Sequence, residues 1–86
     1  MNTPRIRSVS ALDGARLLVI FADETQKVYD CRNVLTLERF QLLRNEAFFK
    51  AVRVDPGGCG ISWNDRVDLS AYELWSNGIE VHDNAK

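Results

Sequence analysis

Residues 55–60, Asp-Pro-Gly-Gly-Cys-Gly, have the composition of a loop that could cradle a phosphate group or hold a metal ion. A phosphate-binding loop opens a helix, and its nucleoside-triphosphate form contains a lysine followed by serine or threonine. Here no lysine directly follows the glycines, and apolar residues alternate on both sides, at Val52 and Val54 before the loop and at Ile61 and Trp63 after it. This alternation predicts two strands joined by a turn, in which proline and glycine supply the required backbone angles.

Metal-binding and catalytic sites have few candidate side chains in this sequence. A structural zinc site uses about four ligands, whereas residues 55–60 contain one cysteine and the only histidine, His82, lies near the C-terminal end. Asp55, Asp65 and Asp68 could form paired carboxylates, but turns and helix starts select aspartate without any chemistry. We therefore predict no catalytic, metal-binding or cofactor-binding residues, and we expect a protein that is not an enzyme.

The two cysteines, Cys31 and Cys59, lie far apart in the sequence and form no metal-binding or redox motif. Since nothing indicates export, we expect free thiols in a cytoplasmic protein, and the sequence leaves open whether the two sulfur atoms come close in space. The longest early apolar run, residues 17–22, is shorter than a signal-peptide core or a membrane span. We therefore expect no association with a membrane.

Alternating and continuous apolar runs predict the strands. They are expected at residues 5–11, 16–22, 26–31, 50–54 and 61–63. Asp13-Gly14 is predicted to form the first hairpin turn, because both residue types tolerate positive φ. The strand at residues 16–22 is expected to be central and covered on both faces, because its apolar run is unbroken.

Two short helices are predicted between and after these strands. Thr36 is expected to cap the first helix, with Leu37, Phe40 and Leu43 on one face. The second helix is expected to begin at the capping box of residues 70–73 and to stop at residues 77–78, Asn-Gly.

Together these elements predict an α+β fold. It consists of a small antiparallel sheet, made of a three-stranded N-terminal meander plus a C-terminal hairpin, packed against short helices. The 86 residues are expected to form a single small domain. Residues 82–86 are expected to be a frayed tail.

Charge is distributed unevenly along the chain. Residues 31–54 carry five basic and two acidic side chains (5 − 2 = +3), and residues 55–86 carry two basic and six acidic ones (2 − 6 = −4). This imbalance is consistent with an ordinary mixed surface, or with a charged partner or self-association. Direct nucleic-acid binding is not expected, because the basic group has neither interleaved aromatic residues nor a recognition helix.

Two parts of the sequence could contact a partner. One is the strand edge at residues 5–10, since an exposed edge invites strand addition. The other is a basic face with one aromatic residue, formed by Arg44, Lys50, Arg53 and Trp63. Trp63 and Trp75 are expected to lie in the core, although they could also line a ligand pocket.

Several segments of the chain resemble the bacterial domain of unknown function 2442 family (DUF2442). They are "LLVIFAD", "QKVYD", "FQLLRN", "FFKAVRVD" and "GISWNDRVDLSAYELW", and they extend from about Val9 to Trp75. The most specific part is Ile61-Ser62-Trp63 followed by residues 67–70, Val-Asp-Leu-Ser, and by a helix. The resemblance implies a small domain in which a meander packs against short helices, and it carries over no catalytic residue.

Similar domains occur alone or fused to a helix-turn-helix, and their genes often neighbour another small gene, as in toxin–antitoxin pairs. This chain has no helix-turn-helix segment. The resulting hypothesis is a non-catalytic protein-interaction module, an antitoxin-like member of a small operon, with a protein partner or a second copy of itself. The alternative is a small-ligand-binding domain with a pocket near Trp63 and Trp75.

Overall fold

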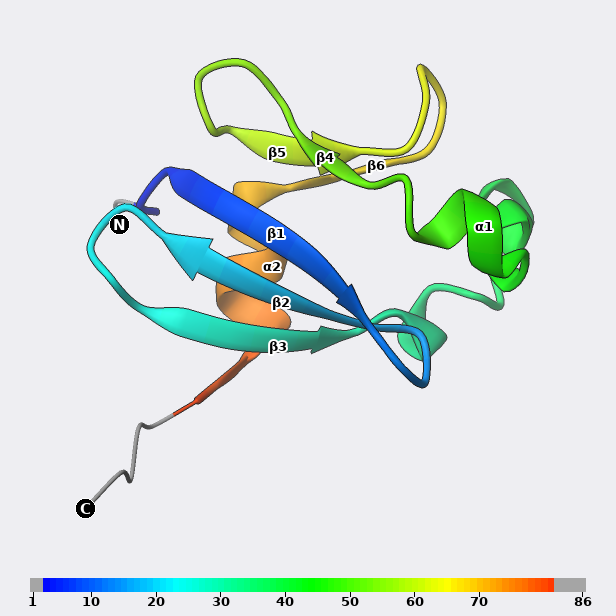
Figure 1. Ribbon diagram of the computed structural model, residues 1–86, viewed down its shortest axis with the longest axis horizontal. Coiled ribbons are helices and arrows are strands. Elements are labelled where there is room, and N and C mark those ends of the chain that lie inside the picture. The colour runs from blue at the N-terminus through cyan, green and yellow to red at the C-terminus, as the bar shows by residue number, and fades with distance from the viewer. Residues whose placement is uncertain (1–2, 82–86) are drawn as a thin grey trace.

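The computed structural model describes residues 3–81 (Figure 1). The predicted α+β class is confirmed, because two small antiparallel sheets pack with short helices. The first sheet has the order β1-β2-β3-β7, with strands Ile6–Leu12, Arg16–Phe21, Gln26–Asp30 and Ile79–Glu80. The second sheet has the order β4-β5-β6, with strands Arg53–Val54, Gly60–Ser62 and Asp68–Ser70. The helices are the 3-10 helices η1 (Cys31–Asn33) and η2 (Glu38–Arg44) and the α-helices α1 (Glu46–Phe49) and α2 (Ala71–Asn77).

The predicted N-terminal meander is confirmed, but its first turn differs in detail. Leu12 pairs with Arg16, so the loop has three residues. Positive φ occurs at Gly14 (77°) and Ala15 (59°) rather than at Asp13. The prediction located the hairpin correctly and placed the left-handed pair one residue too early.

Strand β2 is central, as predicted, but only one of its faces is fully covered. Leu17, Val19 and Phe21 are buried, whereas Leu18 and Ile20 between them are half-buried. Successive side chains of a strand point to opposite faces of the sheet. The unbroken apolar run therefore serves two different faces, and the expectation that both are fully covered is wrong.

The core lies between the inner face of the first sheet, the second sheet and the helices. Residues of both sheets and of α2 belong to one hydrophobic cluster, which includes Leu17, Val19, Phe21, Ile61 and Leu74. In Figure 1 α2 lies behind β1, β2 and β3, and no described element lies in front of these strands. One face of the first sheet is therefore the wall of the core, and the other face is open.

The glycine-rich stretch is a hairpin turn, as predicted. The Asp55 N–H donates to the Gly60 carbonyl, and the Gly58 N–H donates to the Asp55 carbonyl, each at 2.9 Å. Gly57 and Gly58 have positive φ, at 88° and 75°. Gly58 also has a role in packing, because its carbonyl accepts the Ile6 N–H at 2.8 Å and a Cβ on it would lie 2.7 Å from the Ile6 carbonyl oxygen. This contact occupies the beginning of the strand edge at residues 5–10, which the sequence left free for a partner.

Helix α2 follows the predicted signals at both ends. The Ser70 Oγ accepts the Glu73 N–H at 3.0 Å, which satisfies one of the orphan donors of the first turn. The Glu73 carboxylate accepts two side-chain hydrogen bonds, one from the Tyr29 hydroxyl at 2.8 Å and one from the Asn77 amide at 3.0 Å. The helix ends before Gly78, where a Cβ would lie 2.5 Å from the Leu74 carbonyl oxygen.

Two predicted boundaries are corrected, and one prediction lies beyond the described residues. The first predicted helix is a 3-10 helix capped by Leu37, not an α-helix capped by Thr36. The segment after Trp63 contains a strand, β6, which was not predicted and which pairs with β5. The frayed tail predicted for residues 82–86 lies outside the described residues 3–81.

Candidate functional site

The site begins with a groove between η2 and residues 64–67. Its volume is about 770 Å³. The lining residues come from these two segments and are Leu37, Glu38, Arg39, Gln41, Leu42, Asn64, Arg66 and Val67. We call this surface the basic groove, and it combines apolar side chains with two arginines.

The geometry of η2 leaves apolar side chains on the rim of the groove. A 3-10 helix has about three residues per turn, so Phe40 and Leu43 align and are both buried. Leu42 lies on the other side of the helix and is 52% exposed. Leu37 is 48% exposed because it precedes the helix with an extended backbone. The sequence placed Leu37 on the buried face, and this prediction is wrong.

The opposite wall of the basic groove is held by an Asn-based turn. The Asn64 Oδ1 accepts the N–H groups of Arg66 and Val67, each at 2.8 Å. The Trp63 N–H donates to the Val67 carbonyl at 2.9 Å, and Val67 is buried. These bonds fix the backbone below Arg66, so the base of this side chain has a defined position on the rim.

A second depression continues the groove along the same turn. It has a volume of about 500 Å³ and is lined by Arg53, Trp63, Asn64, Asp65 and Arg66. Asn64 and Arg66 line both depressions, so the two form one surface. Arg53 and Trp63, two of the four residues predicted to contact a partner, therefore belong to the site.

Trp63 is primarily a core residue of this wall. It is 4% exposed, its ring stacks on Phe49 with centroids 6.1 Å apart, and its Nε1–H donates to the Phe49 carbonyl at 2.9 Å. Trp75 has different neighbours. It packs edge-on against Phe21, and the Lys27 ammonium lies 4.1 Å from its ring. None of the four depressions described for residues 3–81 is lined by both tryptophans, and Trp63 lines only the second depression of the groove.

The other two predicted contact residues lie in a separate depression. Arg44 and Lys50 line a space of about 490 Å³ between the turn at residues 13–15 and the η2–α1 segment. Lys50 forms an ion pair with Glu46 at 3.2 Å, and Arg44 donates to the neutral Gln41 side chain at 2.9 Å. The predicted surface of Arg44, Lys50, Arg53 and Trp63 is thus divided between two places.

The basic groove has a positive balance of available charge. Arg39, Arg53 and Arg66 line it against Glu38 and Asp65, which gives 3 − 2 = +1. Within residues 3–81 none of these three arginines forms an ion pair with a carboxylate. Arg66 is the residue that sequence reasoning missed. Arg39 belongs to the basic group within residues 31–54, but it was not included in the predicted surface.

A third cleft gathers carboxylates that the sequence treated separately. Asp55, Asp68 and Glu73 line a space of about 590 Å³. Asp55 accepts the Ser62 hydroxyl at 2.6 Å, and Glu73 accepts the Tyr29 hydroxyl. Burial, reinforced by Glu73, raises the pKa of Tyr29. In the described part of the chain no three His, Cys, Asp or Glu side chains lie close enough together to hold a metal ion.

The two cysteines have different surroundings, and both are free thiols. Cys31 is buried, and this burial raises the pKa of its thiol to about 12, so it stays protonated at neutral pH. Cys59 is exposed in the glycine-rich turn.

The described helices are all short. None of those within residues 3–81 has the length and apolar character required to cross a membrane.

Comparison with known proteins identifies the family. The pattern of the family described as "Protein of unknown function (DUF2442)" matches residues 6–80, which is nearly the whole chain. No curated protein and no solved structure matches this chain. The predicted resemblance is confirmed, and the chain belongs to the DUF2442 family.

Proposed function

We propose that this protein is a non-catalytic interaction module that binds a segment of a partner protein in the basic groove. The observation that carries this proposal is the position of two exposed leucines, Leu37 and Leu42, beside arginines that have no carboxylate partner among residues 3–81. Exposed apolar surface bordered by polar groups is typical of binding sites. Arginine is well suited to such a site, because its planar group binds a carboxylate through two parallel hydrogen bonds.

The groove defines the chemistry of the segment that it would bind. Apolar side chains of the partner would cover Leu37 and Leu42, and aspartate or glutamate would pair with Arg39, Arg53 and Arg66. The volume of about 770 Å³ falls within the roughly 300–1,000 Å³ of typical binding pockets.

A more specific form of this proposal rests on the gene neighbourhoods of similar domains, which often contain another small gene, as in toxin–antitoxin pairs. In this form the chain is the antitoxin-like member of a small bacterial operon and acts in the cytoplasm. Its partner is then the small protein encoded by the neighbouring gene, and binding in the groove holds that protein in an inactive complex.

The experiment is to produce the chain together with the product of the neighbouring gene and to measure the complex by titration calorimetry. Leu42→Asp places a carboxylate on the apolar rim, and its fold can be checked by circular dichroism, since Leu42 is 52% exposed. We expect at least about a tenfold loss of affinity, the size typical of a central interface residue. Tyr72→Asp is the matched control, because Tyr72 is 62% exposed and lies on α2, outside the groove.

Two outcomes would contradict the proposal. If the wild-type chain binds neither the neighbouring gene product nor any stoichiometric partner from its host, there is no interaction to explain. If a complex forms but Leu42→Asp and Tyr72→Asp bind as tightly as the wild type, the basic groove is not the binding site.

A further inference from the structure

The first sheet has an apolar face that the described chain leaves uncovered. Leu18 of β2 pairs with Ser10 on one side and with Val28 on the other, and Val28 pairs with Ile79 of β7. Leu18 and Ile20 point away from Leu17, Val19 and Phe21, because side chains alternate along a strand. We call the side chains on this side the outer face, and its apolar members are Leu12, Leu18, Ile20, Val28 and Ile79.

None of these five side chains is part of the hydrophobic core or packs against it. Leu12, Leu18, Ile20 and Val28 are half-buried by their neighbours in the sheet, and Ile79 is 76% exposed. In Figure 1 nothing described lies in front of β1, β2 and β3. A sheet with apolar residues on both faces normally packs a second layer on each face, and here the outer layer is missing.

We propose that the outer face is covered by a second copy of this chain in a two-fold symmetric dimer. The symmetry of such a dimer requires a patch that is complementary to itself. The charges around the outer face meet this requirement, because both signs occur together. Arg16 lies directly opposite Asp30 on the neighbouring strand, and Asp30 holds Arg32 at 2.7 Å.

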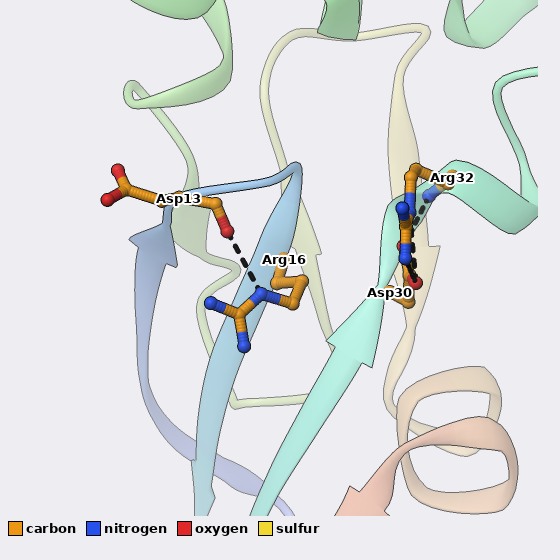
Figure 2. Close-up of polar contacts among 4 residues, drawn as sticks. All are labelled: Asp13, Arg16, Asp30 and Arg32. Atoms are coloured by element: carbon orange, nitrogen blue, oxygen red, sulfur yellow. Dashed lines mark hydrogen bonds and ion pairs between the residues drawn. The ribbon is translucent and has the colours of Figure 1, made fainter.

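Figure 2 shows this mixed-charge end of the sheet, with Arg16 on β2 and the Asp30–Arg32 pair at the end of β3. The Arg16 Nε donates to the Asp13 carbonyl at 2.9 Å, which orients the side chain and leaves its charge without a carboxylate within residues 3–81. A further pair of opposite charges, Arg7 and Glu24, is formed at 2.8 Å elsewhere on the same sheet. A partner surface of a single sign would meet like charges here, whereas a second copy presents charges of both signs.

The shape of the outer face also suits a second copy. Ser8 and Ser10 of β1 lie beside Ile20 and Leu18 of β2, so a shallow strip of small side chains runs along an apolar ridge. A two-fold rotation places the ridge of one copy against the strip of the other. The two sheets have the same twist, and sheets of equal twist pack face to face with their strands nearly aligned.

The size of the face predicts a weak dimer. Six residues of strand extend about 20 Å, and three strands with the short β7 span about 15 Å, which gives roughly 300 Å² per copy. A standard interface buries about 800 Å² per partner. We therefore expect dissociation in the micromolar range, with a Kd of about 10–100 µM.

The experiment is sedimentation velocity of the full chain from about 1 to 500 µM, a range that brackets the expected Kd. The wild type should change from monomer to dimer across this range. Leu18→Lys should raise the Kd at least about tenfold, because it buries an unpaired charge at the centre of the interface. Ile79→Lys is a second variant with little risk to folding, and Tyr72→Lys, which carries the same charge change on α2, should dimerise as the wild type does.

A wild type that remains monomeric throughout this range would overturn the proposal. Normal dimerisation of both folded variants, Leu18→Lys and Ile79→Lys, would also overturn it, since the interface would then lie elsewhere. Leu42→Asp, the groove variant, should still dimerise. The dimer and the groove can therefore fail or succeed independently.

Discussion

The basic groove and the outer face both leave large apolar side chains in contact with water, but they differ in origin and in charge. The groove exists because a 3-10 helix buries Phe40 and Leu43 and leaves Leu37 and Leu42 outside. The outer face exists because a strand of continuous apolar residues has only one covered side. The arginines of the groove have no carboxylate partner among residues 3–81, whereas the outer face carries both signs. The difference in surrounding charge is the reason that we propose a different protein for the groove and an identical copy for the outer face.

The largest expected effect is the difference in stability loss between a substitution in the wall of the groove, at Trp63, and one on its rim, at Leu42. Trp63→Ala should lower the free energy of unfolding by about 3–5 kcal/mol, because it removes a buried ring and leaves the Phe49 carbonyl without its donor. Leu42→Ala should change it by less than about 1 kcal/mol, since this side chain is half in water. Chemical denaturation of both variants measures this difference. Equal losses would mean that the groove is not built on the core.

The two faces of β2 give the next largest effect. Leu17→Ala should cost about 2–5 kcal/mol, because Leu17 is fully buried and its removal leaves a cavity. Leu18→Ala, the next residue, should cost about 1 kcal/mol in the monomer. Denaturation at a protein concentration well below the expected Kd makes the comparison. A cost for Leu18→Ala as large as that for Leu17→Ala would contradict an open outer face.

Salt should distinguish the two interactions. Raising the salt concentration from about 0.05 to 0.5 M should weaken binding in the groove roughly tenfold, because screening reduces the attraction between arginines and carboxylates. The dimer should change less than about threefold, since exposed ion pairs contribute little and the apolar contact is not screened. Calorimetry and sedimentation at both salt concentrations test the contrast. A dimer whose Kd changes more with salt than the Kd of the groove complex would contradict this prediction.

The smallest effect concerns Asp30 at the rim of the outer face. Hydrogen bonds from Arg32 lower the pKa of this carboxyl below its ordinary value of 3.8. A lowered pKa in the folded state stabilises the protein above the unfolded value, and this contribution is lost as the pH falls below about 3.8. Asp30→Asn should therefore cost at most about 1 kcal/mol at pH 7 and progressively less at lower pH. Thermal unfolding from pH 7 to pH 3 checks this trend, and a constant difference between the two proteins would contradict it.

The regular parts of the fold could be predicted from the sequence because local rules decide them. The meander, the glycine-rich turn and the ends of α2 all follow from the residue types at turns and caps. The strand β6 was not predicted, because Asp68–Ser70 alternates over only three residues, and its pairing with β5 depends on tertiary contacts. A three-residue strand of this kind is determined by its partner.

The candidate site was only partly predictable for a related reason. Arg53 and Trp63 lie together because Arg53 is on β4 and Trp63 directly follows β5, the strand that pairs with β4, and the sequence grouped the two residues correctly. Arg44 and Lys50 flank α1 and lie in a separate depression, because no local signal in the sequence indicates how α1 is oriented relative to β4. Arg66 was missed, and Arg39 was left out of the predicted surface, because the two are 27 positions apart (66 − 39) and meet only across the groove.

The hydrogen bond between the Ile6 N–H and the Gly58 carbonyl has a consequence for the order of folding. It joins residues that are 52 positions apart (58 − 6), one at the start of β1 and the other in the glycine-rich turn between β4 and β5. A bond of this range closes late, since the intervening chain must first be ordered. During synthesis the N-terminal meander therefore leaves the ribosome before the segment that locks its first strand has been made. For that interval Leu17, Val19 and Phe21 are as exposed as Leu18 and Ile20. The nascent hairpin therefore has two exposed apolar faces, both prone to aggregation, until residues 58–74 are synthesised and cover one of them.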